Sequence, residues 1–146
     1  MRHHLRRTVY VGDDDASGLI YFPTYSRYMA EGDQDWFSAL GHPVMELIGQ
    51  GVSCPAVSSS CDFTSPARAG DSLEQEIHIT AGRHSSFACH HRFTIGEQTV
   101  ASGRVVRVWV NLADMSPQPL PQWLLDASES ELATSKRDTD NLGTRS

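Results

Sequence analysis

Three kinds of pattern are missing from this chain of 146 residues. No apolar run approaches the ~20 residues that cross a bilayer, and Met1–Arg7 lack the apolar core of a signal peptide. The three cysteines, Cys54, Cys61 and Cys89, form no Cys-x-x-Cys pair, which argues against a zinc knuckle and a disulfide framework. Cations are outnumbered, 12 Lys and Arg against 18 Asp and Glu, which argues against a protein that binds nucleic acid. We expect a cytoplasmic protein that engages neither a membrane nor a nucleic acid.

The length of the chain favours a single domain followed by a tail. Domains of roughly 100–150 residues are the commonest size, so residues 1–126 suffice for one hydrophobic core. Residues 127–146 are mostly polar, with two isolated leucines and no aromatic residue, and predict a flexible tail. Five Arg and His residues crowd positions 1–7, which indicates a solvated, frayed start to the first strand.

One amphipathic helix is predicted near the start of the chain, after a β-prone run at Thr8–Val11. Pro23 suits the first turn of a helix, Gly41 suits the position just past its end, and Pro43 prevents continuation. Between them, apolar residues and one glycine recur at spacings of three and four: Tyr25, Tyr28, Met29, Gly32, Trp36 and Leu40. The glycine on this stripe predicts that a sheet packs very close to the helix backbone.

Every element after the helix is predicted as a strand. Residues 52–63 are rich in Ser and β-branched residues and are broken at Pro55, which indicates an edge or a bulge. Residues 73–80, 87–95 and 99–110 alternate between apolar and polar positions, with short turns between them. This order predicts an α+β fold with one long helix packed on a five-stranded antiparallel sheet. Both faces of the last strand carry apolar residues, which favours an oligomer.

Three adjacent carboxylates, Asp13–Asp15, precede the helix and repel one another, so their proximity needs an explanation. A calcium loop is one alternative, because Asp13, Asp15, Ser17 and Gly18 match positions 1, 3, 5 and 6 of an EF-hand. The bidentate Glu of position 12 is Thr24 here, which argues against calcium. A solvated acidic turn, with Asp15 or Ser17 as a cap, is the other alternative.

The stretch Gly12–Tyr25 resembles a motif of the hotdog-fold acyl-CoA thioesterases, in particular their 4-hydroxybenzoyl-CoA thioesterase branch. That motif is Gly-Asp-x-Asp-x-x-Gly, then Ile or Leu, Val or Ile, two aromatic residues and Pro-x-Tyr at the start of a long helix. The chain reads Gly-Asp-Asp-Asp-Ala-Ser-Gly-Leu-Ile-Tyr-Phe-Pro-Thr-Tyr in the same register. Agreement continues through the helix and in Pro66–Asp71, and the resemblance covers residues 5–125.

The resemblance implies a catalytic role for Asp15, as nucleophile or general base, and for the Phe22 backbone N–H as the oxyanion donor. The chemistry is reasonable, because a carboxylate ahead of a helix start lies beside free N–H groups. Gly18 lets the backbone turn between the two. Asp13 and Asp14 are interpreted as shaping the loop, with either of them as the alternative catalytic group. No cofactor and no metal ion is expected.

Substrate contacts are also implied by the resemblance. Tyr21 and Tyr25 are expected to line the acyl site, and the turn containing Arg83, His84 and Ser85 is expected to bind the CoA phosphates. An ordinary polar hairpin turn is the alternative reading of that segment. Ala30 stands where the hydroxybenzoyl enzyme has a carboxylate, so a 4-hydroxybenzoyl substrate is not favoured, and aromatic or medium-length acyl groups stay open.

Taken together, the residues and the resemblance predict a thioesterase that cleaves an acyl-CoA or an acyl-carrier-protein thioester. The resemblance further implies a homo-oligomer, a dimer or a tetramer, with active sites at the subunit interfaces. A hotdog protein that binds acyl thioesters or a partner without hydrolysing them is the alternative.

Overall fold

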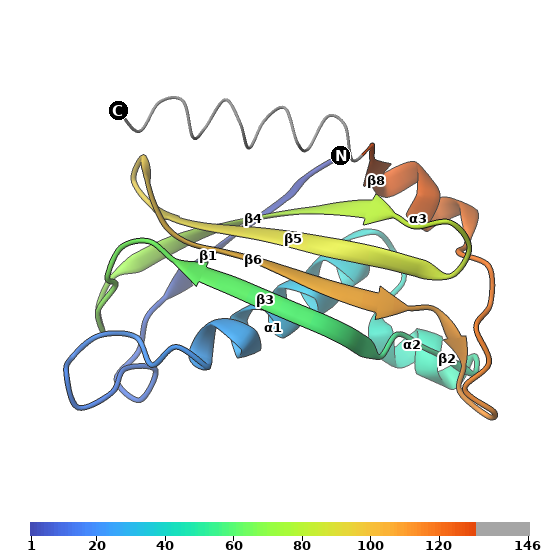
Figure 1. Ribbon diagram of the computed structural model, residues 1–146, viewed down its shortest axis with the longest axis horizontal. Coiled ribbons are helices and arrows are strands. Elements are labelled where there is room, and N and C mark those ends of the chain that lie inside the picture. The colour runs from blue at the N-terminus through green and yellow to red at the C-terminus, as the bar shows by residue number, and fades with distance from the viewer. Residues whose placement is uncertain (131–146) are drawn as a thin grey trace.

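The computed structural model describes residues 1–130, and its centre is a sheet with one helix lying across a face (Figure 1). The elements in chain order are β1 (His3–Thr8), α1 (Thr24–Ala39), α2 (Val44–Gly49), β2 (Val52–Ser53), β3 (Ala56–Phe63), β4 (Ser72–Ala81), β5 (Ser86–Ile95), β6 (Gln98–Val108), β7 (Val110–Asn111), α3 (Gln122–Ala127) and β8 (Ser128–Glu129). Five strands form an antiparallel sheet in the order β1-β4-β5-β6-β3. The predicted α+β hotdog arrangement is confirmed.

Helix α1 follows the predicted stripe. Its first residue, Thr24, comes directly after Pro23, and it ends at Ala39 with Leu40 as the capping residue. Gly41 follows with a φ of 87°, the left-handed conformation that glycine adopts without strain. The side chains that face the sheet are buried: Tyr25, Tyr28, Met29 and Trp36 are each at most 4% exposed.

Gly32 lets α1 approach the sheet. A Cβ atom at this position would lie 2.4 Å from Gln75 Nε2 and 2.9 Å from Ile77 Cδ1, both on β4. The close approach that the glycine predicted is therefore confirmed.

We expect Gly32→Ala to lower the free energy of unfolding by about 1–3 kcal/mol, because the added methyl group must displace packed side chains. Gly49→Ala in α2 is the matched control, since a Cβ atom there meets nothing within 4 Å. Denaturant titration of both variants measures the difference. Equal free energies of unfolding for the two variants would show that the side chains of β4 move aside without loss of stability.

The strands alternate as predicted. The residues of β4 that face α1 are fully buried, namely Leu73, Gln75, Ile77 and Ile79. β5 buries Phe87, Cys89, His91 and Phe93 on the same face. β3 lies at the edge of the sheet and is preceded by the break at Pro55, also as predicted.

The N-terminal segment differs from the prediction of a frayed start. Residues 3–8 pair along their whole length with β4, and the strand ends at Thr8 rather than continuing to Val11. Arg2 and Arg6 form ion pairs with Glu76 and Glu74 of β4. The backbone pairing with β4 accounts for the ordered start of the chain, and the ion pairs add to it.

The prediction that only strands follow α1 is wrong. α2 begins directly after Pro43, which starts this helix instead of only ending the previous one. Leu47 of α2 and Leu124 of α3 are buried in the core cluster that contains Trp36 and Phe87. No helix within residues 1–130 is long and apolar enough to cross a membrane.

The folded part extends past the predicted boundary at residue 126. Ala127 is the last residue of α3, and Ser128–Glu129 pair with β4 as the short parallel strand β8. Glu129 also accepts hydrogen bonds from Arg2. The remainder of the predicted tail, residues 131–146, lies outside the described residues.

Candidate functional site

The acidic segment folds into a small hairpin directly before α1. Tyr21 N donates to Asp13 O at 3.0 Å, and Asp15 N donates to Leu19 O at 2.9 Å. Gly18 closes the turn with a φ of 82° and donates its N–H to Asp15 O at 3.0 Å. The predicted tight turn is present, and it places Asp15 at the tip of the hairpin that leads into α1.

Asp13 is tied down within this hairpin. Its carboxylate accepts hydrogen bonds from Tyr28 Oη at 2.7 Å, from Tyr10 N at 3.0 Å and from Arg27. Burial raises the pKa of Asp13, but the hydrogen bonds from Tyr28 and Tyr10 and the Arg27 cation outweigh it, so the pKa lies below its usual value. Every oxygen of this carboxylate is used inside the protein, as the interpretation of Asp13 as a loop-shaping residue requires.

Asp15 has a different environment, because its side chain is exposed. One oxygen, Oδ1, accepts the Ser17 hydroxyl and the Ser17 backbone N–H, the latter at 2.8 Å. These two hydrogen bonds hold the pKa of Asp15 below its usual value, so the carboxylate is ionised at neutral pH. Within residues 1–130 the other oxygen, Oδ2, has no hydrogen-bond donor, and it is free to act on a ligand.

The remaining carboxylate of the run, Asp14, accepts the Gly12 backbone N–H at 3.1 Å. The three carboxylates therefore have three separate sets of donors instead of one shared ion. Within the described part of the chain, no group of three His, Cys, Asp or Glu side chains is placed to hold a metal ion.

The Phe22 backbone N–H is an available donor at the start of α1. Thr24 N donates to Tyr21 O at 2.8 Å and Tyr25 N donates to Phe22 O at 3.2 Å, whereas Pro23 has no N–H. Within residues 1–130 nothing accepts the Phe22 N–H. A free N–H at a helix start stabilises negative charge on a bound oxygen.

A hollow of about 410 Å³ lies beside this loop, and its lining is mostly apolar. The residues around it are Leu19, Ile20, Phe22, Tyr25, Phe63, Thr64, Ser65, Pro66 and Ala67. Tyr25 is only 4% exposed and packs edge-to-face against Phe93, so it belongs mainly to the core. Tyr21 is half exposed and contacts Phe22, which leaves it accessible to a ligand.

The turn expected to bind CoA, between β4 and β5, lies at the opposite end of the sheet from the loop before α1 (Figure 1), which contains Asp15. β4 has ten residues and runs between the two ends, and at ~3.3 Å per residue its length is about 33 Å. Arg83 and His84 are exposed, and within residues 1–130 the Arg83 guanidinium has no partner. Ser85 O accepts Trp109 N at 2.7 Å, which fixes the backbone of the turn. One chain therefore does not bring Arg83 and Asp15 together.

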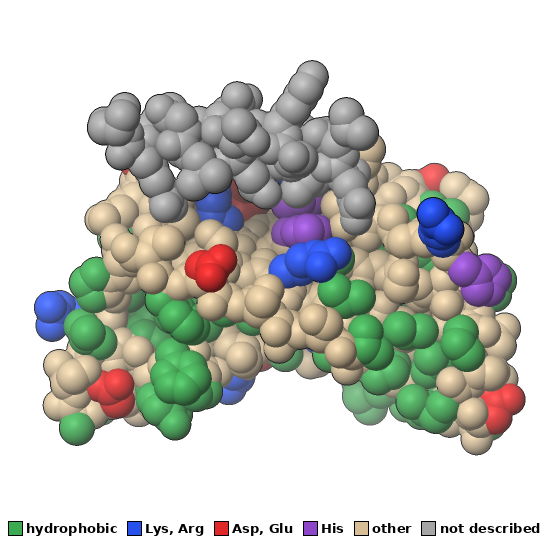
Figure 2. Space-filling model, in the orientation of Figure 1, with side chains coloured by type: hydrophobic (Ala, Val, Ile, Leu, Met, Phe, Trp, Pro, Cys, Tyr) green, Lys and Arg blue, Asp and Glu red, His purple; other side chains and the backbone are tan. Residues whose placement is uncertain are grey.

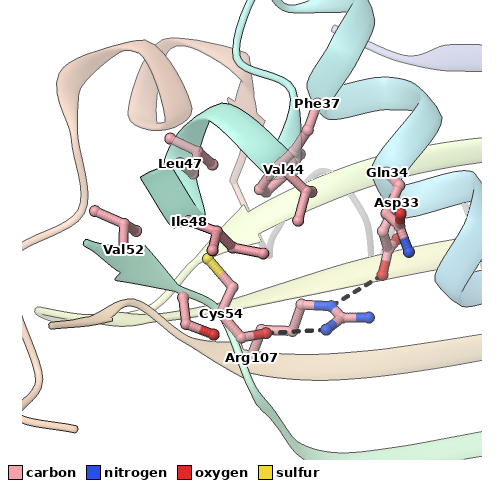
Figure 3. Close-up of a pocket in the computed structure, with 10 residues that line it drawn as sticks. Asp33, Gln34, Phe37, Val44, Leu47, Ile48, Val52, Cys54 and Arg107 are labelled. Atoms are coloured by element: carbon pink, nitrogen blue, oxygen red, sulfur yellow. Dashed lines mark hydrogen bonds and ion pairs between the residues drawn. The ribbon is translucent and has the colours of Figure 1, made fainter. Parts of the chain in front are cut away.

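A second hollow, of about 220 Å³, lies between α1, α2, β2 and β6 (Figure 3). Its lining consists of Asp33, Gln34, Phe37, Val44, Leu47, Ile48, Val52, Ser53, Cys54 and Arg107. Asp33 accepts a hydrogen bond from Arg107 Nε at 3.0 Å, and Arg107 Nη1 donates to Cys54 O at 2.9 Å. The side chains of α2 form an apolar wall, and the ion pair forms a polar wall across from it (Figure 3).

The Asp33 carboxylate ends a chain of buried hydrogen bonds. Arg7 Nε donates to Gln75 Oε1 at 2.6 Å, so the Gln75 amide nitrogen faces His91 Nδ1 at 3.0 Å. Nδ1 accepts this hydrogen bond, and the ring proton of His91 therefore lies on Nε2, which donates to Asp33 Oδ1 at 2.8 Å. Each donor in the chain has an acceptor, and Asp33 is held in one orientation.

No sequence motif predicts the pairing of Asp33 with Arg107. Two features of the sequence nevertheless place both residues on buried faces. Asp33 lies four residues after Met29 and therefore falls on the buried stripe of α1, where a charged residue needs a partner. Arg107 alternates with Val105 and Trp109 and therefore faces α1.

Comparisons with known proteins agree with this geometry. The sequence model of the thioesterase-like superfamily matches residues 9–128. A 1,4-dihydroxy-2-naphthoyl-CoA hydrolase from Synechocystis is 30% identical over 119 residues, which cover 80% of this chain and 86% of that protein. The crystal structure of a 1,4-dihydroxy-2-naphthoyl-CoA thioesterase from Synechocystis has a TM-score of 0.81 at 28% identity, covering 87% of this chain and 95% of the other. The structure of a gentisyl-coenzyme A thioesterase has a TM-score of 0.75 at 31% identity, covering 85% of this chain and 98% of the other.

The matched range takes in the Asp15 hairpin, α1 and all of the sheet except β1 and part of β8. The resemblance drawn from the sequence is thus confirmed, and so is the predicted class of enzyme, a thioester hydrolase. The chain belongs to the thioesterase-like superfamily.

Proposed function

We propose that the protein hydrolyses the thioester of an acyl-CoA, with Asp15 as nucleophile or general base and the Phe22 N–H as oxyanion donor. The observation that carries the proposal is the pairing of an exposed, ionised carboxylate with a free backbone N–H on one hairpin. Attack on a thioester carbonyl moves negative charge onto its oxygen, and a preorganised N–H donor stabilises that charge. Asp15 supplies either the attacking oxygen or the base that activates water.

An aromatic acyl group is the favoured substrate. The relatives named above act, by their names, on 1,4-dihydroxy-2-naphthoyl-CoA and gentisyl-CoA, which both have acyl groups built on a hydroxylated ring. The hollow of about 220 Å³ supports this size, because an apolar cavity of about 150 Å³ holds one benzene ring. An acyl group on a carrier protein is the alternative substrate, and a cytoplasmic location stays a prediction.

A second copy of the chain completes the site. β3 is an edge strand whose residues are almost all exposed, including Val57 and Phe63, and such an edge pairs readily with another strand. Phe63 ends β3 beside the Asp15 hairpin, whereas Ala56 begins β3 opposite Arg107. Antiparallel pairing of two β3 strands about a two-fold axis therefore sets the Asp15 hairpin of one copy beside the Arg107 hollow of the other.

The surface supports this assembly. Hydrophobic side chains gather at two places, over the loop before α1 and over α2 and β2 (Figure 2). Phe22 is 63% exposed in the first patch and Met45 is 76% exposed in the second. The two patches lie at opposite ends of β3. Antiparallel pairing of two β3 strands therefore sets the first patch of one copy against the second patch of the other.

Static light scattering at micromolar concentration should give a mass at least twice the 16.1 kDa of one chain. The physical reason is that a monomer leaves the β3 edge and both apolar patches in water. A stable species of 16.1 kDa would contradict a site shared by two copies. In one copy, Arg83 and Asp15 lie at opposite ends of the sheet and cannot bind the same substrate.

Arg83→Ala should raise KM for an acyl-CoA about three- to fivefold and leave kcat nearly unchanged, because an exposed guanidinium–phosphate contact lies far from the reacting carbonyl. The effect should shrink at high salt. An N-acetylcysteamine thioester, which has no nucleotide, is the matched control and should not distinguish the variant from wild type. Equal KM values on acyl-CoA would place the nucleotide elsewhere and favour a carrier-protein substrate.

The test of the proposed function is release of free thiol from a panel of thioesters. The panel contains benzoyl-CoA, gentisyl-CoA, 1,4-dihydroxy-2-naphthoyl-CoA, a medium-chain acyl-CoA and the same acyl groups on a carrier protein. We expect turnover with at least one aromatic acyl-CoA. Tight binding of these thioesters without thiol release would overturn the proposal in favour of a binding protein.

A further inference from the structure

The hollow between α1 and α2 combines two kinds of surface. Apolar side chains of α1, α2 and β2 surround most of it, namely Phe37, Val44, Leu47, Ile48 and Val52. The Asp33–Arg107 ion pair forms a polar wall across from α2 (Figure 3), and Gln34, Ser53 and Cys54 complete the lining. A flat apolar ligand with one polar substituent is complementary to such a site.

Asp33 is rigid. Its side chain is 5% exposed, and its two oxygens accept hydrogen bonds from His91 Nε2, from Arg107 Nε and from the Cys89 thiol. A carboxylate has about four acceptor positions, so one remains after these three contacts. The Asp33 carboxylate can therefore accept a hydrogen bond from a ligand hydroxyl without rotating.

Arg107 has a donor to spare. Nε donates to Asp33 and Nη1 donates to Cys54 O, but Nη2 has no acceptor within residues 1–130. The Arg107 side chain is 19% exposed, so a ligand can reach it. The pair carries no net charge, which favours a neutral ligand oxygen over a carboxylate: the carboxylate would be attracted by Arg107 but repelled by Asp33.

From these contacts we infer that the Asp33–Arg107 pair determines acyl specificity, by selecting a small ring that carries a hydroxyl or carbonyl oxygen. A hydroxyl accepts from Arg107 Nη2 and donates to the Asp33 carboxylate, whereas a carbonyl uses the Arg107 donor alone. The inference rests on the proposed function, in which the hollow of one copy receives the acyl group attacked from the Asp15 hairpin of the other. Asp33 and Arg107 are the specificity residues, and His91 is the positioning residue that orients Asp33.

The size of the discrimination follows from desolvation. An acyl group without the oxygen covers Arg107 Nη2 and removes its water while offering no acceptor. Sites built to bind a substrate hydroxyl reject analogues that lack it, often by large factors. Since Arg107 is only partly buried, we expect a ratio of about ten- to a hundredfold in kcat/KM.

The experiment compares benzoyl-CoA with its 2-, 3- and 4-hydroxy isomers. For the wild type, at least one hydroxy isomer should exceed benzoyl-CoA in kcat/KM by about tenfold or more. Arg107→Lys keeps a cation opposite Asp33 but loses the planar donor fork, so it should bring this ratio close to one by lowering kcat/KM more for the preferred hydroxy isomer than for benzoyl-CoA. Asp33→Asn tests the other half of the pair and should lower the ratio in the same direction.

Two variants control for the substitutions themselves. Arg104→Lys changes an exposed arginine three residues earlier in β6, and Asp35→Asn changes an exposed carboxylate on α1. Both should keep the wild-type ratio. Thermal unfolding of all four variants identifies any loss of fold. If Arg107→Lys lowers kcat/KM equally for every substrate, Arg107 has a structural role only and the inference is wrong. The inference is also wrong if the variant keeps the wild-type ratio of hydroxy isomer to benzoyl-CoA.

A second readout separates this inference from the proposed function. Binding of hydroxybenzamides and benzamide, which carry no carboxylate, to the intact protein is measured by calorimetry and does not require hydrolysis. If the wild type hydrolyses no thioester but binds a hydroxybenzamide more tightly than benzamide, and Arg107→Lys loses that preference, the specificity role stands while the proposed function fails. If the wild type shows no preference by either readout, the specificity role is wrong.

Discussion

Asp15→Asn should lower kcat by at least ~10²-fold, the scale expected when a positioned acid–base or nucleophilic group is lost. The amide retains the shape of the side chain and can still accept the Ser17 hydrogen bonds, but it neither attacks a carbonyl nor takes a proton from water. The fold should be unchanged, because the Asp15 side chain is exposed and bonds only to Ser17. Steady-state thiol release, with thermal unfolding as the check on folding, measures both effects.

Asp14→Asn is the matched control for this variant. Asp14 lies next to Asp15 in the same hairpin, and its carboxylate accepts only the Gly12 N–H, which an Asn oxygen accepts equally well. We expect turnover close to wild type. Near-wild-type turnover of Asp15→Asn would instead move the chemistry to another carboxylate, with Asp13, Asp14 and Glu31 as the alternatives.

Asp13→Ala should destabilise the protein by about 3 kcal/mol, which makes it the largest expected effect on folding. The substitution leaves the buried Tyr28 hydroxyl and the Tyr10 N–H without their acceptor and releases Arg27. Denaturant titration at pH 7 measures the loss. A change below about 0.5 kcal/mol would contradict the reading of Asp13 as the residue that holds the hairpin to α1.

The stability conferred by Asp13 should depend on pH in a defined direction. Its pKa is lowered in the folded protein, so the contribution is fully present above the unfolded value of about 3.9 and is lost as the pH falls through the lower folded value. The difference between wild type and Asp13→Ala should therefore be constant from pH 7 to about 5 and shrink below pH 4. A difference that grows on acidification would contradict this assignment.

The helix and the long strands were predictable because their signals are local and repeated. The α1 stripe recurs over four turns, and β4 and β5 alternate over ten residues each, so a few exceptions do not hide the period. α2 and α3 have six residues each, less than two turns, and no period can be established over that length. They form because Leu47 and Leu124 fill the core beside the end of α1, which depends on tertiary packing.

The candidate site divides in the same way. The Asp15 hairpin is continuous in sequence, so its turn and its position before α1 could be predicted from residue types. The Asp33 network joins α1 to β5 and β6 across sequence separations of 58 and 74 residues, and only the sheet order brings these side chains together. Likewise, the distance between Arg83 and Asp15 follows from the direction of β4, which no short motif contains.

We expect Asp15 and the Phe22 N–H to act on a thioester carbonyl at a site shared by two copies of the chain. A crystal structure with a thioether analogue, in which a methylene separates the sulfur from the acyl carbonyl, tests this most directly. We expect the carbonyl oxygen at about 2.7–3.1 Å from Phe22 N, with the carbonyl carbon facing Asp15 and the ring in the hollow of the second copy. A carbonyl bound away from both Phe22 and Asp15 would contradict it.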